Sequence, residues 1–169
     1  AGAAAMVRHL IDCGHRAIVH VEGPEGNVEA ADRARGYAQA MEAAGLNPVI
    51  LPGNFDEESG RRAVERLQAE QVDVDAIFAA NDMTAIGVMV ALRDMGVDVP
   101  TQVAVAGFDN IPLARLISPG LTPMAVDIAD MGARGINRLV ALIDGEAVPQ
   151  MELRQPGLII RTSSQLSAA

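Results

Sequence analysis

Apolar and polar residues follow two alternating patterns along the chain, one typical of helices and the other typical of buried strands. Residues 3–13 place Met6, Val7, Leu10 and Ile11 at helical spacing. Continuous apolar runs such as 103–107 (VAVAG) suit strands that are covered on both faces. The predicted helices are 3–13, 28–44, 56–70, 83–95 and 129–143. The predicted strands are 17–22, 48–51, 75–80 and 103–107, with a short extended piece at 121–127 and one or two strands within 151–160.

This order of elements predicts an α/β fold with a parallel sheet. Strands that alternate with helices form right-handed βαβ units, which place helices on both faces of the sheet. The chain has 169 residues, and half of them are hydrophobic, but it has only three Phe, one Tyr and no Trp. That composition favours Ala-rich helices packed on a sheet over a β-sandwich. We therefore expect one doubly wound lobe with a core of its own.

Charge and chemistry exclude several classes of protein. The net charge is −9 and every basic residue other than the three His is Arg, so this segment should not bind DNA by itself. A single cysteine, Cys13, forbids an internal disulfide and is compatible with a reducing compartment. The His residues lack metal-ligand spacing, and the Ser residues lack a nucleophile-elbow context. We expect no catalytic activity, no metal, no cofactor and no membrane span.

Polar and aromatic residues follow the carboxyl ends of four predicted strands. In an open parallel sheet, ligands bind beyond these ends, where the loops of different strands meet. The candidate ligand-binding residues are Asn27, Glu29 and Arg33 after the first strand, Phe55 after the second, Asn81 after the third and Asp109 after the fourth.

These residue types suit the recognition of a small polar ligand. Asp109 can accept hydrogens from two adjacent hydroxyl groups, and Arg33 can donate a two-pronged fork to the same oxygens or to a carbonyl. Asn81 can both donate and accept, and Phe55 can offer a flat apolar face to a sugar ring or a base. The set predicts binding of a sugar-like or nucleobase-like compound.

Structural roles compete with ligand contact at five of these six positions. We expect Asp82 to be the N-cap of helix 83–95 rather than a ligand contact. The competing roles at the candidate positions are helix capping by Asn81, capping by Asp109 of a turn with Pro112, an ion pair of Arg33 with Glu29, core packing by Phe55, and a solvated helix position for Glu29.

The chain resembles the sensor core of the lactose-repressor/galactose-repressor (LacI/GalR) family of bacterial transcription regulators. The resemblance covers nearly all residues, and its motifs stand in the family's order. They are LIDCGHRAI at 10–18, GP at 23–24, RARGY at 33–37, FDEESG at 55–60, IFAANDMTAIG at 77–87, VPTQVAVAGFDN at 99–110, PGLTP at 119–123, MG at 131–132 and LIIRTSS at 158–164.

The resemblance implies a periplasmic-binding-protein-like (type I) fold of two lobes, with an effector bound in the cleft between them. In that family the residues that match Arg33 and Asp109 hold effector hydroxyls or carbonyls, and those that match Asn81 and Phe55 face the cleft. The positions of Asn27 and Glu29 vary with the effector. This chain departs from the family at Val126 and Pro123, where more polar residues are usual, and these departures leave the hinge side of the implied cleft less polar.

The resemblance also implies how the chain relates to a longer protein. Residues 1–169 match the C-terminal effector-binding region, mainly the lobe distal to DNA, and the helix within 128–145 belongs to a lobe outside this chain. Separated from that lobe, the helix would expose Ile136, Leu139, Val140 and Ile143. Contact with DNA would occur only through a headpiece that this chain lacks.

We therefore expect a cytoplasmic, homodimeric transcription regulator whose DNA binding responds to a small-molecule effector, with no membrane partner. A competing interpretation is a periplasmic sugar-binding protein of an ABC transporter, which has the same fold. A third is a small α/β enzyme that uses the same strand ends, for which a nucleophile or metal cluster would be needed.

Overall fold

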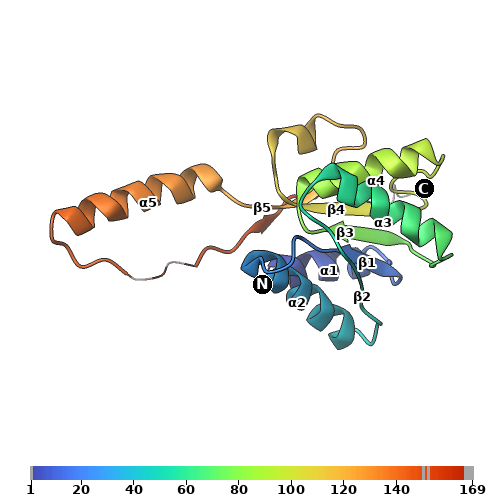
Figure 1. Cartoon of the computed structure of the whole chain (residues 1–169), viewed down its shortest axis with the longest axis horizontal. Coiled ribbons are helices and arrows are strands. Elements are labelled where there is room, and N and C mark those ends of the chain that lie inside the picture. The colour runs from blue at the N-terminus through green and yellow to red at the C-terminus, as the bar shows by residue number, and fades with distance from the viewer. Residues whose placement is uncertain (1, 150, 152, 166–169) are drawn as a thin grey trace.

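A six-stranded, mostly parallel sheet forms the centre of the molecule (Figure 1). The computed structural model describes residues 2–149, 151 and 153–165. The sheet order is β2-β1-β3-β4-β5-β6; strands β1 to β5 are parallel, and β6 is antiparallel to β5. The expected parallel α/β fold is thus confirmed. The strands are β1 (Ile18–Val21), β2 (Val49–Leu51), β3 (Ala76–Ala79), β4 (Ala104–Asp109), β5 (Thr122–Ala125) and β6 (Gly157–Leu158).

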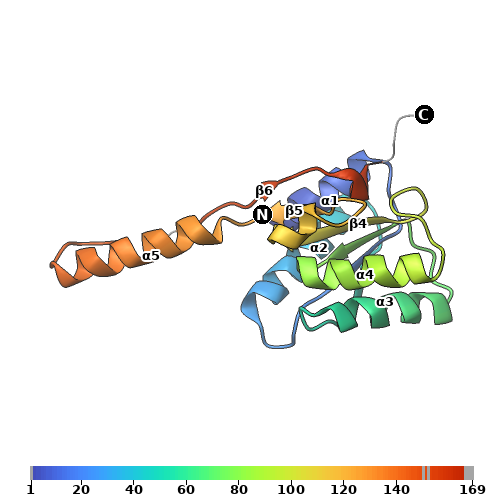
Figure 2. The same ribbon diagram turned by 90° about the horizontal axis from the view of Figure 1, so that it is seen from above.

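Helices cover both faces of the sheet, as the alternating pattern predicts (Figure 2). The helices α1 (Gly2–Asp12) and α2 (Val28–Ala43) pack on one face, and α3 (Glu57–Ala69) and α4 (Asp82–Asp94) pack on the other. Each face has a separate buried cluster, because side chains of one strand point alternately to the two sides. Two short 3₁₀ helices, at Pro112–Arg115 and Thr162–Ser164, lie in segments expected to be loop or tail.

Side-chain caps explain where the site-bearing helices begin. The Asn27 side chain accepts a hydrogen bond from the Ala30 N–H (2.9 Å) at the start of α2. The Asn81 side chain does the same for the Thr84 N–H (2.9 Å) at the start of α4. The prediction that Asp82 is the N-cap of this helix is wrong. Asp82 is the first helical residue, and its carboxylate turns into the protein instead of towards the helix amides.

Two glycines let α3 and α4 pack with their backbones in close contact. A Cβ atom added to Gly60 would overlap the Thr84 carbonyl oxygen, and one added to Gly87 would overlap the Glu57 carbonyl oxygen. No side chain can be accommodated at either position without moving a helix. This contact fixes the start of α4, and therefore fixes Asn81 and Asp82.

The fifth helix, α5 (Ile128–Ile143), projects away from the sheet in both views (Figures 1 and 2). None of its residues is buried, and its large apolar side chains are exposed, for example Ile136 at 63% and Ile143 at 75%. The exposure expected for these residues is therefore observed. The chain then returns to the sheet edge, where β6 pairs with β5.

Candidate functional site

Arg33 joins the ends of two central strands. Its side chain extends from α2, and one guanidinium nitrogen, Nη1, donates to the Ala80 carbonyl oxygen directly after β3 (2.6 Å). The other, Nη2, donates to the Asp109 Oδ1 atom at the end of β4 (3.4 Å). The two side chains keep 15% and 26% of their surface exposed. The structure thus brings together two predicted site residues that are 76 positions apart, and Arg33 pairs with Asp109 rather than Glu29.

Two aromatic rings flank the guanidinium group. Its central carbon lies 4.0 Å from the centroid of the Phe108 ring and 5.6 Å from that of the Phe55 ring. Such contacts orient the guanidinium plane and stabilise its charge. Phe55 also packs directly over Gly23, where a Cβ atom would overlap its ring. Phe55 therefore packs beside Arg33 and stays partly exposed, so it is not a fully buried core residue.

Asp109 has an unusual backbone conformation and an unusual electrostatic environment. Its φ angle of +106° and that of Asn110, +66°, lie in the left-handed region that side chains rarely adopt. Burial raises the pKa of Asp109, the positive charge of Arg33 opposes that rise, and the negative charge of Glu29 adds to it. The carboxylate is thus held partly out of water beside one cation, where it can accept hydrogen bonds from a ligand.

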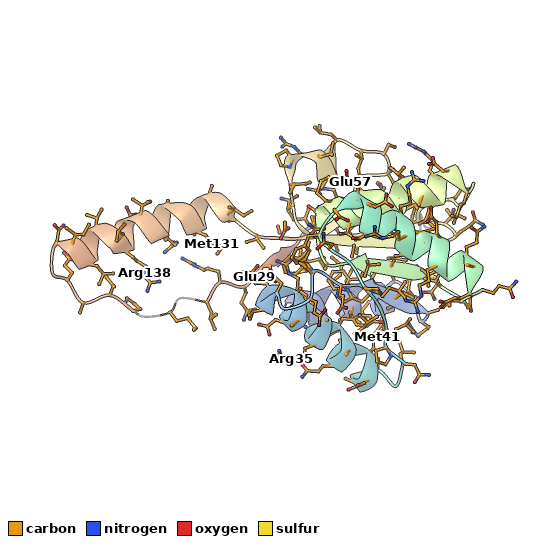
Figure 3. The ribbon with its side chains drawn as sticks, viewed as in Figure 1. Glu29, Arg35, Met41, Glu57, Met131 and Arg138 are labelled. Atoms are coloured by element: carbon orange, nitrogen blue, oxygen red, sulfur yellow. The ribbon has the colours of Figure 1, made fainter. Side chains whose placement is uncertain are left out.

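A hollow of about 1370 Å³ opens beside this pair. Its lining includes Glu29, Arg33, Phe108, Asp109 and Asn110 on the lobe, together with the start of α5, the returning segment 153–157, and residues 2–3, 32, 111–112 and 125–127. Glu29 lies near the N-terminus of α2, on the side of the lobe from which α5 projects (Figure 3). Guanidinium, carboxylate, amide and aromatic groups therefore share one concave surface at the carboxyl ends of the strands.

Three predicted site residues do not line this hollow. The Asn81 side chain donates to the Phe55 carbonyl oxygen (2.8 Å) and caps α4, so both ends of its amide are engaged by the protein. Asn27 caps α2, and Phe55 stands behind Arg33. The structure therefore shows Asn81 in its helix-capping role, because a cap residue at this point satisfies a free helix amide. Contact of these three residues with a ligand stays a prediction.

Phe108 and Asn110 were not among the predicted site residues. Phe108 lies in β4, one residue beyond the predicted strand, and is only 6% exposed, yet its ring lies against the guanidinium group of Arg33. Asn110 supplies the amide of the hollow, and its Oδ1 atom accepts a hydrogen bond from Arg161 (2.7 Å). Their position directly beside Asp109 in the chain was the only sequence signal for them.

A second cavity, of about 360 Å³, lies away from these residues. It is formed by α4 and the segments 96–99 and 117–119, and it contains none of the predicted site residues. Within the described residues, no three His, Cys, Asp or Glu side chains are grouped so as to hold a metal ion. No helix in that part of the chain is long and apolar enough to cross a membrane.

Sequence comparison matches residues 7–164 to the periplasmic binding protein-like domain. The ribose operon repressor of Halalkalibacterium halodurans is 29% identical over 98% of this chain and 50% of its own length. The HTH-type transcriptional repressor PurR of Escherichia fergusonii is 34% identical over 92% of this chain and 47% of its own length. The chain spans about half the length of these curated relatives.

Solved structures of transcription regulators have the same fold. The lac repressor dimer bound to operator and the anti-inducer ONPF superposes with a TM-score of 0.91 at 26% identity, covering 97% of this chain and 50% of that chain. The complex of the transcriptional regulator CelR with cellobiose superposes with a TM-score of 0.89 at 33% identity, covering 96% of this chain and 51% of that chain.

Proposed function

The chain belongs to the family of periplasmic-binding-protein-like domains, its relatives are LacI-type transcriptional repressors, and from this premise we propose that it senses a small polar effector for a bacterial transcription regulator. The observation that carries the proposal is the Arg33–Asp109 pair at the wall of the hollow. The hydrogen bonds to Ala80 and Asp109 use two of the five N–H donors of Arg33. The remaining donors and the Asp109 carboxylate can hold one ligand between them.

The charges around the hollow favour an uncharged ligand. Arg33 and Arg154 face five carboxylates there, so the wall is negative overall. An anion such as a sugar phosphate would meet repulsion, whereas a hydroxyl-rich sugar or a neutral base offers both donors and acceptors. The carboxylates are Glu29, Asp32, Asp109, Asp127 and Asp130.

The rest of the regulator would lie outside this chain. We propose that the exposed apolar side of α5 packs against a second lobe, so that the ligand lies in the cleft between the two lobes. Burial of the exposed side chains of α5 supplies the driving force for that contact. Because the net charge is −9, contact with DNA is assigned to a separate headpiece, and the headpieces would be paired in a cytoplasmic homodimer.

The signal would be a shift between two closure angles of the lobes. A ligand changes this equilibrium only by as much as its affinities for the two arrangements differ. No part of this mechanism requires bond making or breaking, so we propose a sensor and not an enzyme. The regulator is favoured over a binding protein of an ABC transporter because the named relatives are repressors.

A thermal-shift and calorimetry screen with D-ribose, cellobiose and adenine tests the proposal. For a compound that binds, Arg33→Ala and Asp109→Ala should each weaken affinity at least about tenfold, since each removes a charged hydrogen-bonding partner. Arg35→Ala is the matched control, because Arg35 lies on the same helix with 63% of its side chain exposed and pairs only with Asp32 among the described ion pairs (Figure 3). Unchanged affinity in both Arg33→Ala and Asp109→Ala would refute the assignment of the ligand to this site.

A further inference from the structure

A buried carboxylate lies beneath the turn that carries Asp109. Asp82 has no exposed surface, and its Oδ2 atom accepts a hydrogen bond from the Ile111 N–H (2.8 Å), 29 positions away. Within the described residues its Oδ1 atom has no hydrogen-bond partner, and it faces Gly107, where a Cβ atom would overlap it. A buried carboxylate that is only partly satisfied is costly, so its position calls for a function.

The turn above it is conformationally strained. Asp109 and Asn110 both have positive φ angles; such a conformation costs up to about 1–3 kcal/mol per residue and persists only where the surrounding structure holds it in place. Relaxation of either residue would rotate the Asp109 carboxylate away from Arg33. The turn therefore needs fixed partners on the side opposite to the hollow.

Arg161 supplies the second such partner. Its Nη2 atom donates to the Asn110 Oδ1 atom (2.7 Å), and its Nη1 atom donates to the Leu121 carbonyl oxygen (2.7 Å). Arg161 lies in the segment that returns from α5 and passes β6, and its backbone N–H donates to the Thr122 hydroxyl (2.9 Å) at the start of β5. Neither Arg161 nor Asp82 lines the hollow.

We propose that Asp82 and Arg161 are positioning residues, which hold the Asp109–Ile111 turn from behind so that the Asp109 carboxylate faces Arg33 and the ligand. The assignment of the ligand to this site rests on the function proposed above. Arg161 also ties the turn to the segment that comes back from α5. A movement of that segment is thereby transmitted to the ligand-binding carboxylate through one side chain.

The electrostatics of the cluster agree with this geometry. Burial raises the pKa of Asp82 to about 7, and the negative charge of Asp109 adds to the rise, whereas the N–H groups of Ile111 and Asn110 and the charge of Arg161 oppose it. The pKa of Asp82 therefore depends on the charges of both Asp109 and Arg161, as expected because Asp82 and Arg161 both contact the turn that carries Asp109.

Amide hydrogen exchange tests the positioning without any ligand. In the 169-residue chain, Asp82→Ala and Arg161→Gln should speed the exchange of the Asn110 and Ile111 amides at least about tenfold, while amides of β3 keep their protection. Asp82→Asn should retain slow exchange, because its amide oxygen can still accept from Ile111. Arg66→Gln is the control for loss of an Arg, since its half-exposed side chain pairs with Glu70 on α3.

Ligand affinity gives the second measurement, with D-ribose, cellobiose and adenine as probes. For a probe that binds, Asp82→Ala and Arg161→Gln should weaken affinity at least about tenfold, and Asp82→Asn and Arg66→Gln less than about threefold. Unchanged amide exchange in both disruptive variants would overturn the positioning role even if a probe binds at Arg33. Faster exchange in the absence of any binding probe would support the positioning role and count against the proposed ligands.

Discussion

Replacement of Asp82 by Asn should make the chain's stability respond differently to pH. The pKa of Asp82 is about 7 in the folded chain against an ordinary value of 3.8. Between pH 3.8 and about pH 7 the folded chain keeps a proton on Asp82 that the unfolded chain has released. The stability that comes from this bound proton is therefore complete below about pH 4 and is lost as the pH rises through 7. The difference corresponds to about 4 kcal/mol.

The Asn variant is uncharged at every pH and imitates the protonated acid. The free energy of unfolding of the unchanged chain, minus that of Asp82→Asn, should fall by about 4 kcal/mol between pH 4 and pH 8. Urea denaturation followed by circular dichroism measures it; fluorescence is unsuitable because the chain has no Trp. Burial lowers the pKa of His20 to about 4, which weakens the fold at low pH, but this effect is common to both proteins and cancels.

Asp94→Asn provides the control, because Asp94 lies on the same helix with 46% of its side chain exposed. The same difference measured for this variant gives the baseline. A difference that stays flat between pH 4 and pH 8 for Asp82→Asn would contradict the prediction, since it would mean that the buried carboxylate keeps its ordinary acidity.

Three further sets of substitutions test the fold. Gly87→Ala should lower stability by about 1–3 kcal/mol or more in urea titrations, because the added methyl group meets the α3 backbone, whereas Gly135→Ala, which has open space on α5, should raise it by up to about 1 kcal/mol. Tyr37→Phe should cost about 1–3 kcal/mol by thermal unfolding, because the Tyr37 hydroxyl bonds to backbone atoms of β1 and β2. The pair Ile136→Ser and Ile143→Ser should leave the melting temperature unchanged, because both side chains are exposed, and should reduce self-association in gel filtration. An unchanged stability of Gly87→Ala or Tyr37→Phe, or a large loss for the Ser pair, would contradict the packing described.

The order of elements was predictable because it depends on local patterns. The helix predicted at 28–44 is observed at Val28–Ala43, and the strand predicted at 103–107 is observed at Ala104–Asp109. Parallel topology followed from the strand–helix alternation alone. Less could be foreseen for the tail, where only Gly157–Leu158 forms a strand among the described residues, because short sheet-edge strands depend on a partner that sequence does not reveal.

The pair at the site was predictable, but its surroundings were not. Arg33 and Asp109 follow strands whose carboxyl ends meet by topology, and the structure places them 3.4 Å apart. Whether a polar side chain at a strand end turns to the hollow or to its own helix depends on local geometry. For that reason the sequence predicted the wrong role for Asp82 and did not decide between two roles for Asn81. Arg161 reaches the site from 51 positions beyond Asn110, a contact that no local pattern signals.

Mapping of backbone amide shifts by NMR during titration tests most directly whether a ligand lies between Arg33 and Asp109. The titration would use whichever of D-ribose, cellobiose and adenine binds in the calorimetric screen. The largest shift changes should fall on Arg33 and on residues 108–111 around the hollow. Changes concentrated instead around the cavity between α4 and segments 96–99 and 117–119 would contradict this placement of the ligand.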